Sequence, residues 1–108
     1  MKITEEIIPL IEKALDIKLL GPQREYLVND GSYWYGGRTS GKTLAYCIKL
    51  ALSDGEPLKM EEPEKFCDID YGSPENKNRY ARWFFRQFFY DVWRRLKAAG
   101  LPARELRF

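Results

Sequence analysis

The chain has 108 residues, of which 44% are hydrophobic and 31% are charged, and its formal net charge is +2. This length suffices for one small domain with its own core, but it lies far below that of a complete doubly wound nucleotide-binding motor domain. The sequence contains no histidine, which excludes the usual zinc pairings and histidine-based catalytic arrangements.

The amino-terminal segment carries apolar residues at helical spacing. They are Ile3, Ile7, Ile8, Ile11, Ala14 and Leu15. The pattern predicts a helix that packs on the carboxyl-terminal helix, with Thr4 as its cap, while Pro9 predicts a kink or a later start. Residues 1–6 are acidic and lack the apolar stretch of a secretory signal, and no apolar run approaches the ~18 residues of a membrane span. We therefore expect a cytoplasmic protein with no membrane partner.

A helix, a strand, a loop and a second helix are predicted next, in that order. Residues 19–27 predict a short helix opened by Pro22, and the aromatic residues 32–35 predict a strand that runs directly into Gly36. Residues 44–52 predict the second helix. This order is the one that a phosphate-binding loop needs.

The loop between this strand and this helix satisfies the pattern G-x-x-x-x-G-K-[ST] at every fixed position. Its residues are Gly36, Gly37, Arg38, Thr39, Ser40, Gly41, Lys42 and Thr43. The glycines let successive backbone N–H groups face a phosphate, Lys42 reaches the outer phosphates, and the Thr43 hydroxyl can hold Mg²⁺. The motif predicts binding of ATP or another phosphate ligand, and its alternative is a purely structural glycine-rich turn.

Residues 20–53 resemble the front end of the ATPase domain of phage terminase large subunits and, more loosely, helicase-like P-loop NTPases. The upstream glutamine, Gln23, and the loop of residues 37–43 carry this resemblance. It implies that Gln23 recognises adenine, that Lys42 contacts the β- and γ-phosphates, and that Thr43 binds Mg²⁺. It also implies that Arg38 stabilises charge during hydrolysis, which makes Arg38 and Lys42 the catalytic candidates in a phage or mobile-element type of protein.

The acidic motif of a complete ATPase is not evident in the sequence. A terminase ATPase core continues with further parallel strands and with an apolar strand that ends in Asp-Glu. The nearest substitute is the alternating stretch 66–71, which predicts a half-exposed strand or an extended loop. Asp68 or Asp70 could face a bound Mg²⁺ from this stretch, and a solvated face is the alternative. We therefore expect at most a partial ATPase.

Residues 54–64 form the clearest loop-like stretch, because a glycine and two prolines lie among acidic residues. The two cysteines flank this stretch, with Cys47 in the predicted post-loop helix and Cys67 in the predicted strand. Both are expected to be buried thiols rather than partners in a disulfide.

The strongest helix signal lies in residues 74–100. Pro74 suits the first helical position, and Gly100 predicts the end of the helix. At steps of about 100° per residue the helix has one core face, with Phe84 and Phe89 at its edges. That face consists of Ala81, Phe85, Phe88, Val92, Leu96 and Ala99.

The opposite face of this helix is basic and aromatic. Residues 75–108 carry nine basic residues and three acidic ones, and Trp83 and Trp93 are interleaved among the basic residues. The predicted partner-binding residues are Arg79, Arg82, Arg86, Tyr90, Arg94 and Lys97. Arginine attracts phosphates and aromatic rings stack on bases, so one interpretation is a surface for nucleic acid or nucleoprotein. The other is a solvated basic face whose aromatic rings pack on the domain.

Together these elements predict a single domain over residues 1–108, of the α+β or small α/β class. It is expected to be mostly helical, with a minimal two-strand element and a long aromatic carboxyl-terminal helix. Two functions compete. The first is a nucleotide-binding protein that uses the phosphate loop. The second is a non-enzymatic regulator or inhibitor, for example of a host nuclease, that binds nucleic acid or nucleoprotein through the basic helix.

Overall fold

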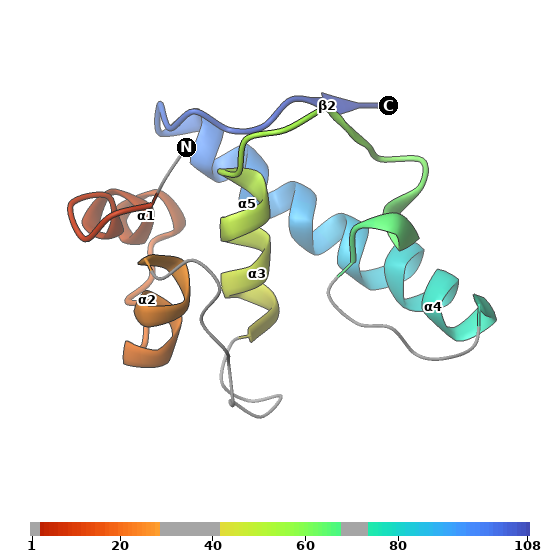
Figure 1. Ribbon diagram of the computed structural model, residues 1–108, viewed down its shortest axis with the longest axis horizontal. Coiled ribbons are helices and arrows are strands. Elements are labelled where there is room, and N and C mark those ends of the chain that lie inside the picture. The colour runs from red at the N-terminus through yellow and green to blue at the C-terminus, as the bar shows by residue number, and fades with distance from the viewer. Residues whose placement is uncertain (1–2, 29–41, 68–73) are drawn as a thin grey trace.

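The computed structural model describes residues 3–28, 42–67 and 74–108 (Figure 1). The elements in chain order are α1 (Ile8–Leu15), α2 (Gly21–Val28), α3 (Lys42–Ala51), β1 (Leu58–Lys59), a 3₁₀ turn (Pro63–Lys65), α4 (Pro74–Tyr80), a π-helical turn (Ala81–Phe85), α5 (Arg86–Ala98) and β2 (Leu106–Arg107). The described chain is mostly helical, with a two-strand parallel sheet and an aromatic carboxyl-terminal helix. The predicted fold class is therefore confirmed.

Helix α1 begins later than its apolar spacing alone would suggest, as Pro9 predicts. Its first residue is Ile8, so Pro9 lies in the first turn, where a missing N–H costs no intrahelical bond. The expected Thr4 cap is wrong, because Ile7 precedes the helix and no side chain caps it. The helix ends at Asp16, which has a φ of 53°. The predicted packing of this helix on the carboxyl-terminal helix is confirmed by its contacts with α5.

The carboxyl-terminal helix is one continuous helical path from α4 through the π-helical turn into α5 (Figure 1). Gly100 ends it with a φ of 87°, a conformation that glycine adopts without steric cost. The Leu101 N–H donates to the Leu96 carbonyl at 3.2 Å, and the Gly100 N–H donates to the Lys97 carbonyl at 3.0 Å. These two bonds form a Schellman motif, so the predicted stop at Gly100 is confirmed.

The buried face of this helix differs from the predicted face at its aromatic positions. Ala81, Phe85, Val92 and Leu96 are buried as expected. Phe89, placed at an edge by the 100° spacing, is fully buried, while Phe88 is half-buried and Ala99 is exposed. The reason is a ring from outside the helix: Phe66 lies 5.9 Å from the Phe85 centroid and 5.8 Å from that of Phe89. The helix therefore turns Phe89 rather than Phe88 toward the core.

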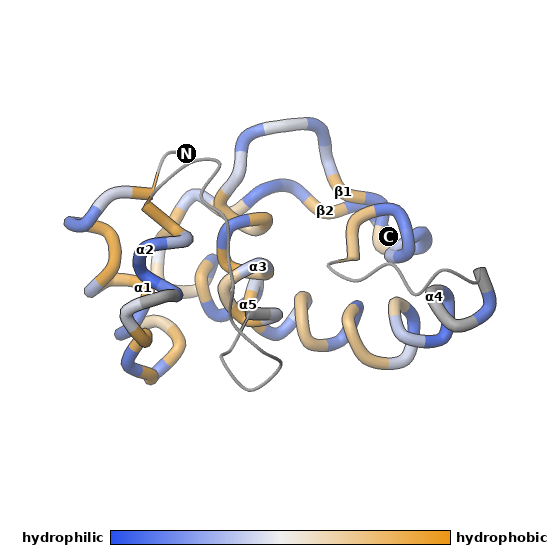
Figure 2. The backbone as a smooth tube through the Cα atoms, turned by 60° about the horizontal axis from the view of Figure 1, so that its bottom comes forward, coloured by the Kyte–Doolittle hydropathy of each residue, from blue (hydrophilic) through white to orange (hydrophobic). Residues whose placement is uncertain are grey.

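The two strands lie elsewhere than the sequence predicts. Strands β1 and β2 pair in parallel, with Leu58 opposite Leu106 and Lys59 opposite Arg107 (Figure 2). Strand β1 falls within the stretch 54–64, which was predicted as a loop. Its short alternation of a buried Leu58, an exposed Lys59 and a buried Met60 is typical of a half-buried strand.

Of the strand and the loop predicted as alternatives for 66–71, the strand is wrong at the two residues that the structure describes, because Phe66 is part of a turn and Cys67 has no regular secondary structure. The predicted strand at 32–35 lies outside the described residues. Cys47 is fully buried as expected, but Cys67 is only half-buried. It packs against the edge of the core, and its thiol donates to the Glu64 carbonyl with an S–O distance of 3.8 Å.

Helix α3 lies across α5 and supplies the centre of the core (Figure 1). Its buried residues are Ala45, Cys47, Ile48 and Ala51. Three of them, Cys47, Ile48 and Ala51, pack with Phe85, Phe89 and Leu96 of the carboxyl-terminal helix and with Ile11 of α1 in one hydrophobic cluster. Within the described ranges, no helix is both long enough and apolar enough to cross a membrane.

Candidate functional site

The phosphate-loop motif extends across a boundary of the described residues. Residues 36–41, which include Arg38, Thr39 and Ser40, lie outside them, as do the acidic candidates Asp68 and Asp70. Lys42 and Thr43 are the first two residues of α3, and Thr43 is half-buried. The post-loop helix therefore already includes the lysine and the threonine of the motif, which precede its predicted start at residue 44.

The position of this helix start has a chemical consequence. The first backbone N–H groups of an α-helix have no acceptor within the helix, and the helix dipole places partial positive charge at the same end. Helix α3 has ten residues, and its far end is fully buried at Ala51. Its side is held by the Tyr46 hydroxyl, which donates to the Phe66 carbonyl at 2.7 Å. The Lys42 end is thus carried on a helix that is anchored in the core.

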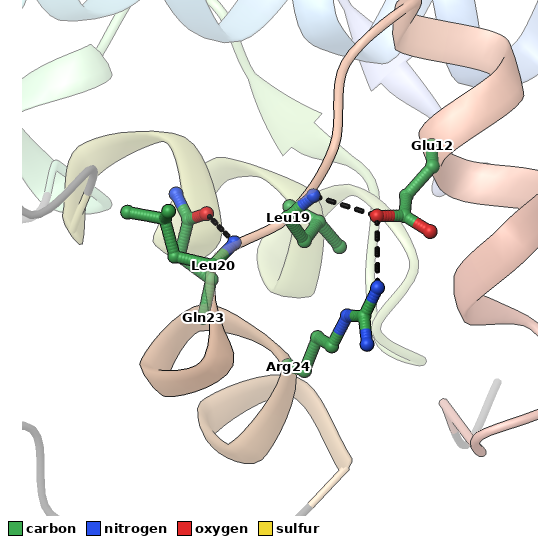
Figure 3. A network of polar contacts seen from close by, with 5 residues as sticks. All are labelled: Glu12, Leu19, Leu20, Gln23 and Arg24. Atoms are coloured by element: carbon green, nitrogen blue, oxygen red, sulfur yellow. Dashed lines mark hydrogen bonds and ion pairs between the residues drawn. The ribbon is translucent and has the colours of Figure 1, made fainter.

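Gln23 has a structural role at the start of α2. It is 4% exposed, and its Oε1 accepts a hydrogen bond from the Leu20 N–H at 2.8 Å (Figure 3). Leu20 directly precedes the helix, so Gln23 at the third helical position reaches back to it as the glutamine of a capping box does. The contact of Gln23 with adenine stays a prediction. In the structure the Oε1 atom of Gln23 already accepts a hydrogen bond from the Leu20 N–H.

A carboxylate joins α1 to the start of α2. The Oε2 of Glu12 accepts a bond from the Leu19 N–H at 2.7 Å and another from Arg24 Nη2 at 3.3 Å (Figure 3). The backbone hydrogen bond from Leu19, together with Arg24, lowers the pKa of Glu12 below its ordinary value of 4.5, although partial burial opposes the shift. The sequence spacing gave no signal for this contact, which fixes α2 against α1.

We expect Glu12→Gln to lower the stability of the protein at neutral pH and to leave it unchanged in acid. Folding lowers the pKa of Glu12, so its contribution is complete above the unfolded pKa and is lost as the pH falls through the folded pKa. Thermal unfolding of the variant and the wild type at a series of pH values from neutral to below 4.5 checks this. Glu25→Gln, at an exposed position of α2, is the control. A gap between variant and wild type that does not depend on pH would contradict the role of the Glu12 charge.

Helix α2 is also tied to α3 through Lys49. Its Nζ donates to the Tyr26 carbonyl at 3.2 Å and lies 4.6 Å from the centroid of the Tyr26 ring. The carbonyl bond satisfies one of the last acceptors of α2, and the ring contact is a cation–π interaction. Because α1 holds one end of α2 and α3 holds the other, Gln23 and the Lys42 end of α3 belong to one packed unit.

The second half of the basic helix is largely engaged within the protein. Tyr90 stacks on Trp93 at 5.9 Å, and Lys97 Nζ lies 4.8 Å from the Trp93 ring centroid. Arg94 Nη2 bonds Asp91 at 2.8 Å, and Arg95 Nε lies 3.1 Å from the other oxygen of Asp91. The bond from Arg94 is the main cause that lowers the pKa of Asp91. Three of the predicted partner-binding residues therefore already have partners: Tyr90, Arg94 and Lys97.

The first half of the basic helix is more open. Trp83 is 76% exposed, and the described residues give it no ring contact. In the same part of the chain, neither Arg79 nor Arg86 forms an ion pair with another described residue. Arg82 is the exception, because its Nη2 lies 3.4 Å from Glu64 Oε1. The structure thus separates the predicted partner-binding residues into an open group and an engaged group.

Arg104 is a key structural residue that sequence reasoning missed. Its Nε donates to the Glu56 carbonyl at 2.7 Å, and its Nη1 donates to the Ser53 Oγ at 3.1 Å. A Cβ at Gly55 would lie 2.6 Å from the guanidinium, so the glycine leaves room for it. The Arg104 carbonyl in turn accepts the Trp93 Nε1–H at 2.6 Å. No local pattern signals this residue, because its side-chain partners lie about fifty positions earlier in the chain.

The described residues contain no cluster of three or more acidic or cysteine side chains that could hold a metal ion. Thr43 remains the Mg²⁺ ligand that the motif predicts, and the alternatives Asp68 and Asp70 lie outside the described residues. Comparison of the chain with protein-family models, with curated proteins and with solved structures gives no match.

Proposed function

We propose that this protein binds ATP, or another ligand with a phosphate chain, together with Mg²⁺ through residues 36–43. The observation that carries the proposal is that Lys42 and Thr43 of the motif are helical and belong to α3. A complete G-x-x-x-x-G-K-[ST] pattern that leads into a helix at its lysine has both the sequence and the helix position that phosphate binding requires.

Each residue of the motif has an expected part in binding. The backbone N–H groups of the glycine loop surround the phosphates, Lys42 neutralises the outer phosphates, and the Thr43 hydroxyl holds Mg²⁺. Arg38 adds positive charge beside the phosphates, and Asp70 contributes a metal ligand. The terminase resemblance assigns the contact with adenine to Gln23, on the helix packed against α3, and this contact requires the buried side chain to leave its bond to the Leu20 N–H.

Binding rather than hydrolysis is the activity that we propose. Phosphoryl transfer to water needs a group that positions the attacking water, and no such residue is evident in the sequence. Lys42 and Arg38 could stabilise charge on the phosphates, but that stabilisation alone does not activate water. We assign the protein to the phage or mobile-element type because of its resemblance to the terminase front end.

Isothermal titration with ATP and Mg²⁺ tests the proposal. We expect the wild-type protein to bind and Lys42→Ala to lose binding, because the lysine supplies the positive charge for the outer phosphates. Lys13→Ala, which removes the same charge from an exposed position of α1, is the matched control and is expected to bind as the wild type does.

Two further ligands separate the parts of the site. Inorganic tripolyphosphate reports on the loop alone, and GTP in place of ATP reports on recognition of the base by Gln23. Weaker binding of GTP than of ATP supports the role of Gln23. Equal binding by the wild type and Lys42→Ala, or no heat with ATP, GTP and tripolyphosphate, would show that residues 36–43 do not hold a phosphate chain.

A further inference from the structure

The exposed indole of Trp83 lies in the middle of the basic carboxyl-terminal helix. Trp83 is 76% exposed, and the following residue, Phe84, is 51% exposed. Full burial of one large aromatic side chain stabilises a fold by about 2–3 kcal/mol. Trp83 contributes only a small part of this stabilisation, because most of its surface contacts water. Folding therefore does not explain why a tryptophan stands at this position.

The backbone at this position is also unusual. Trp83 lies within the π-helical turn Ala81–Phe85. Single π-helical turns inside α-helices are rare and occur frequently at functional sites. The inner side of the turn packs the core through Ala81 and Phe85, while its outer side presents Trp83 and Phe84. The turn therefore combines a buried side with an exposed aromatic side.

Positive charge surrounds the indole. Arg79 lies four residues before Trp83 and Arg86 three residues after it, which places both on neighbouring turns of the helix. Among the described residues neither arginine has an acidic partner. Arg94 and Arg95, farther along the same helix, share Asp91 as an ion-pair partner. Two arginines without an acidic partner among the described residues therefore lie on either side of Trp83.

We propose that the surface formed by Arg79, Trp83 and Arg86 binds single-stranded nucleic acid. A base stacks on the indole and the flanking phosphates pair with the arginines, which is the pattern of sequence-tolerant single-strand binding. Arg79 and Arg86 are seven residue steps apart along the helical path, so at the α-helical rise of about 1.5 Å they lie at most about 10 Å apart along the axis, about the length of three stacked nucleotides. Double-stranded nucleic acid keeps its base faces stacked, and an acidic peptide offers no planar ring to the indole, so both fit this surface less well.

Fluorescence anisotropy with a short labelled oligothymidylate at about 50 mM salt tests the proposal. We expect Trp83→Ala to weaken binding about tenfold, because one base–aromatic stack is lost, while Trp83→Phe keeps most of the affinity. We expect replacement of Arg79 and Arg86 by glutamine to reduce the slope of log affinity against log salt by about 1.4, since each phosphate contact on a single strand contributes about 0.7.

Two controls separate this surface from the rest of the protein. Arg94→Gln removes an equal charge from the same helix at a position paired with Asp91, and it is expected to change the affinity much less than Arg86→Gln does. Lys42→Ala is expected to leave oligothymidylate binding unchanged, so failure of the phosphate-loop proposal and failure of this one are distinguishable.

Three results would overturn the proposal. The first is an absence of oligothymidylate binding by the wild type at low salt. The second is an unchanged affinity of Trp83→Ala, which would leave a surface that attracts anions without stacking a base. The third is displacement of the oligonucleotide by a polyglutamate peptide of equal charge, which would identify the surface as one for an acidic protein.

Discussion

Phe85→Ala is expected to lower the free energy of unfolding by about 3–5 kcal/mol. Phe85 is fully buried and lies at the centre of a ring cluster, with the Tyr46, Phe66 and Phe89 centroids within 6.0 Å of its own. Removing its ring takes away buried apolar surface and leaves a cavity that three neighbouring rings can fill only in part. Because small domains have about 5–15 kcal/mol of stability in total, the variant is expected to be partly unfolded at physiological temperature.

Phe84→Ala is the matched control for this prediction. It removes the same ring from the adjacent residue of the same helical turn, but Phe84 is 51% exposed. We expect a loss of about 1 kcal/mol or less, because half of that ring already contacts water. Denaturant unfolding followed by circular dichroism measures both variants. Equal losses for Phe84→Ala and Phe85→Ala would contradict the assignment of the core face.

Arg104→Ala is expected to lower stability by about 2 kcal/mol, which is typical of charge-assisted hydrogen bonds. The variant loses the bonds to the Glu56 carbonyl and to the Ser53 hydroxyl. These bonds join the segment that follows α3 to the residues just before strand β2, whereas the backbone bond from the Arg104 N–H to the Ala51 carbonyl remains. The sheet bonds from the Leu58 and Met60 N–H groups to the Glu105 and Arg107 carbonyls are then expected to open more often.

Amide hydrogen exchange checks this second prediction. Faster exchange is expected at the amides of Leu58 and Met60. The amides in the middle of α3 exchange mainly through global unfolding, so their rates are expected to change only as much as the overall stability does. Arg107→Ala is the matched control, because Arg107 is exposed and carries the same charge three residues later. We expect it to change stability by less than about 0.5 kcal/mol. Unaltered exchange at Leu58 in Arg104→Ala would show that the arginine does not hold the sheet.

The helices could be predicted from the sequence because their determinants are local. Apolar spacing, Pro9, Pro22 and Gly100 locate the starts and ends of three helical segments to within a few residues. The strands could not be predicted, because each has two residues and both are specified by pairing between distant parts of the chain. The π-helical turn also has no local signal.

The candidate sites show the same division between local and distant determinants. The phosphate-loop pattern and the helix that follows it can be predicted from consecutive residues. The ion pairs of Asp91 with Arg94 and Arg95 follow from a spacing of three and four residues. The pairing of Arg82 with Glu64 could not be predicted, since 18 positions separate the two residues. The exposure of Trp83 likewise could not be predicted from local sequence. It depends on which face of the carboxyl-terminal helix packs against Phe66, and Phe66 lies outside that helix.

The contact of Arg104 with Glu56 joins residues that are 48 positions apart and lie on either side of the carboxyl-terminal helix in the sequence. Closing so long a loop costs chain entropy before any contact compensates for it, whereas helical contacts form locally and fast. We therefore expect the helices to assemble first and the Arg104 contact and the sheet to form after the folding transition state. Contacts that form this late act on the rate of unfolding, so the two short strands and their arginine mainly determine how long the native state persists.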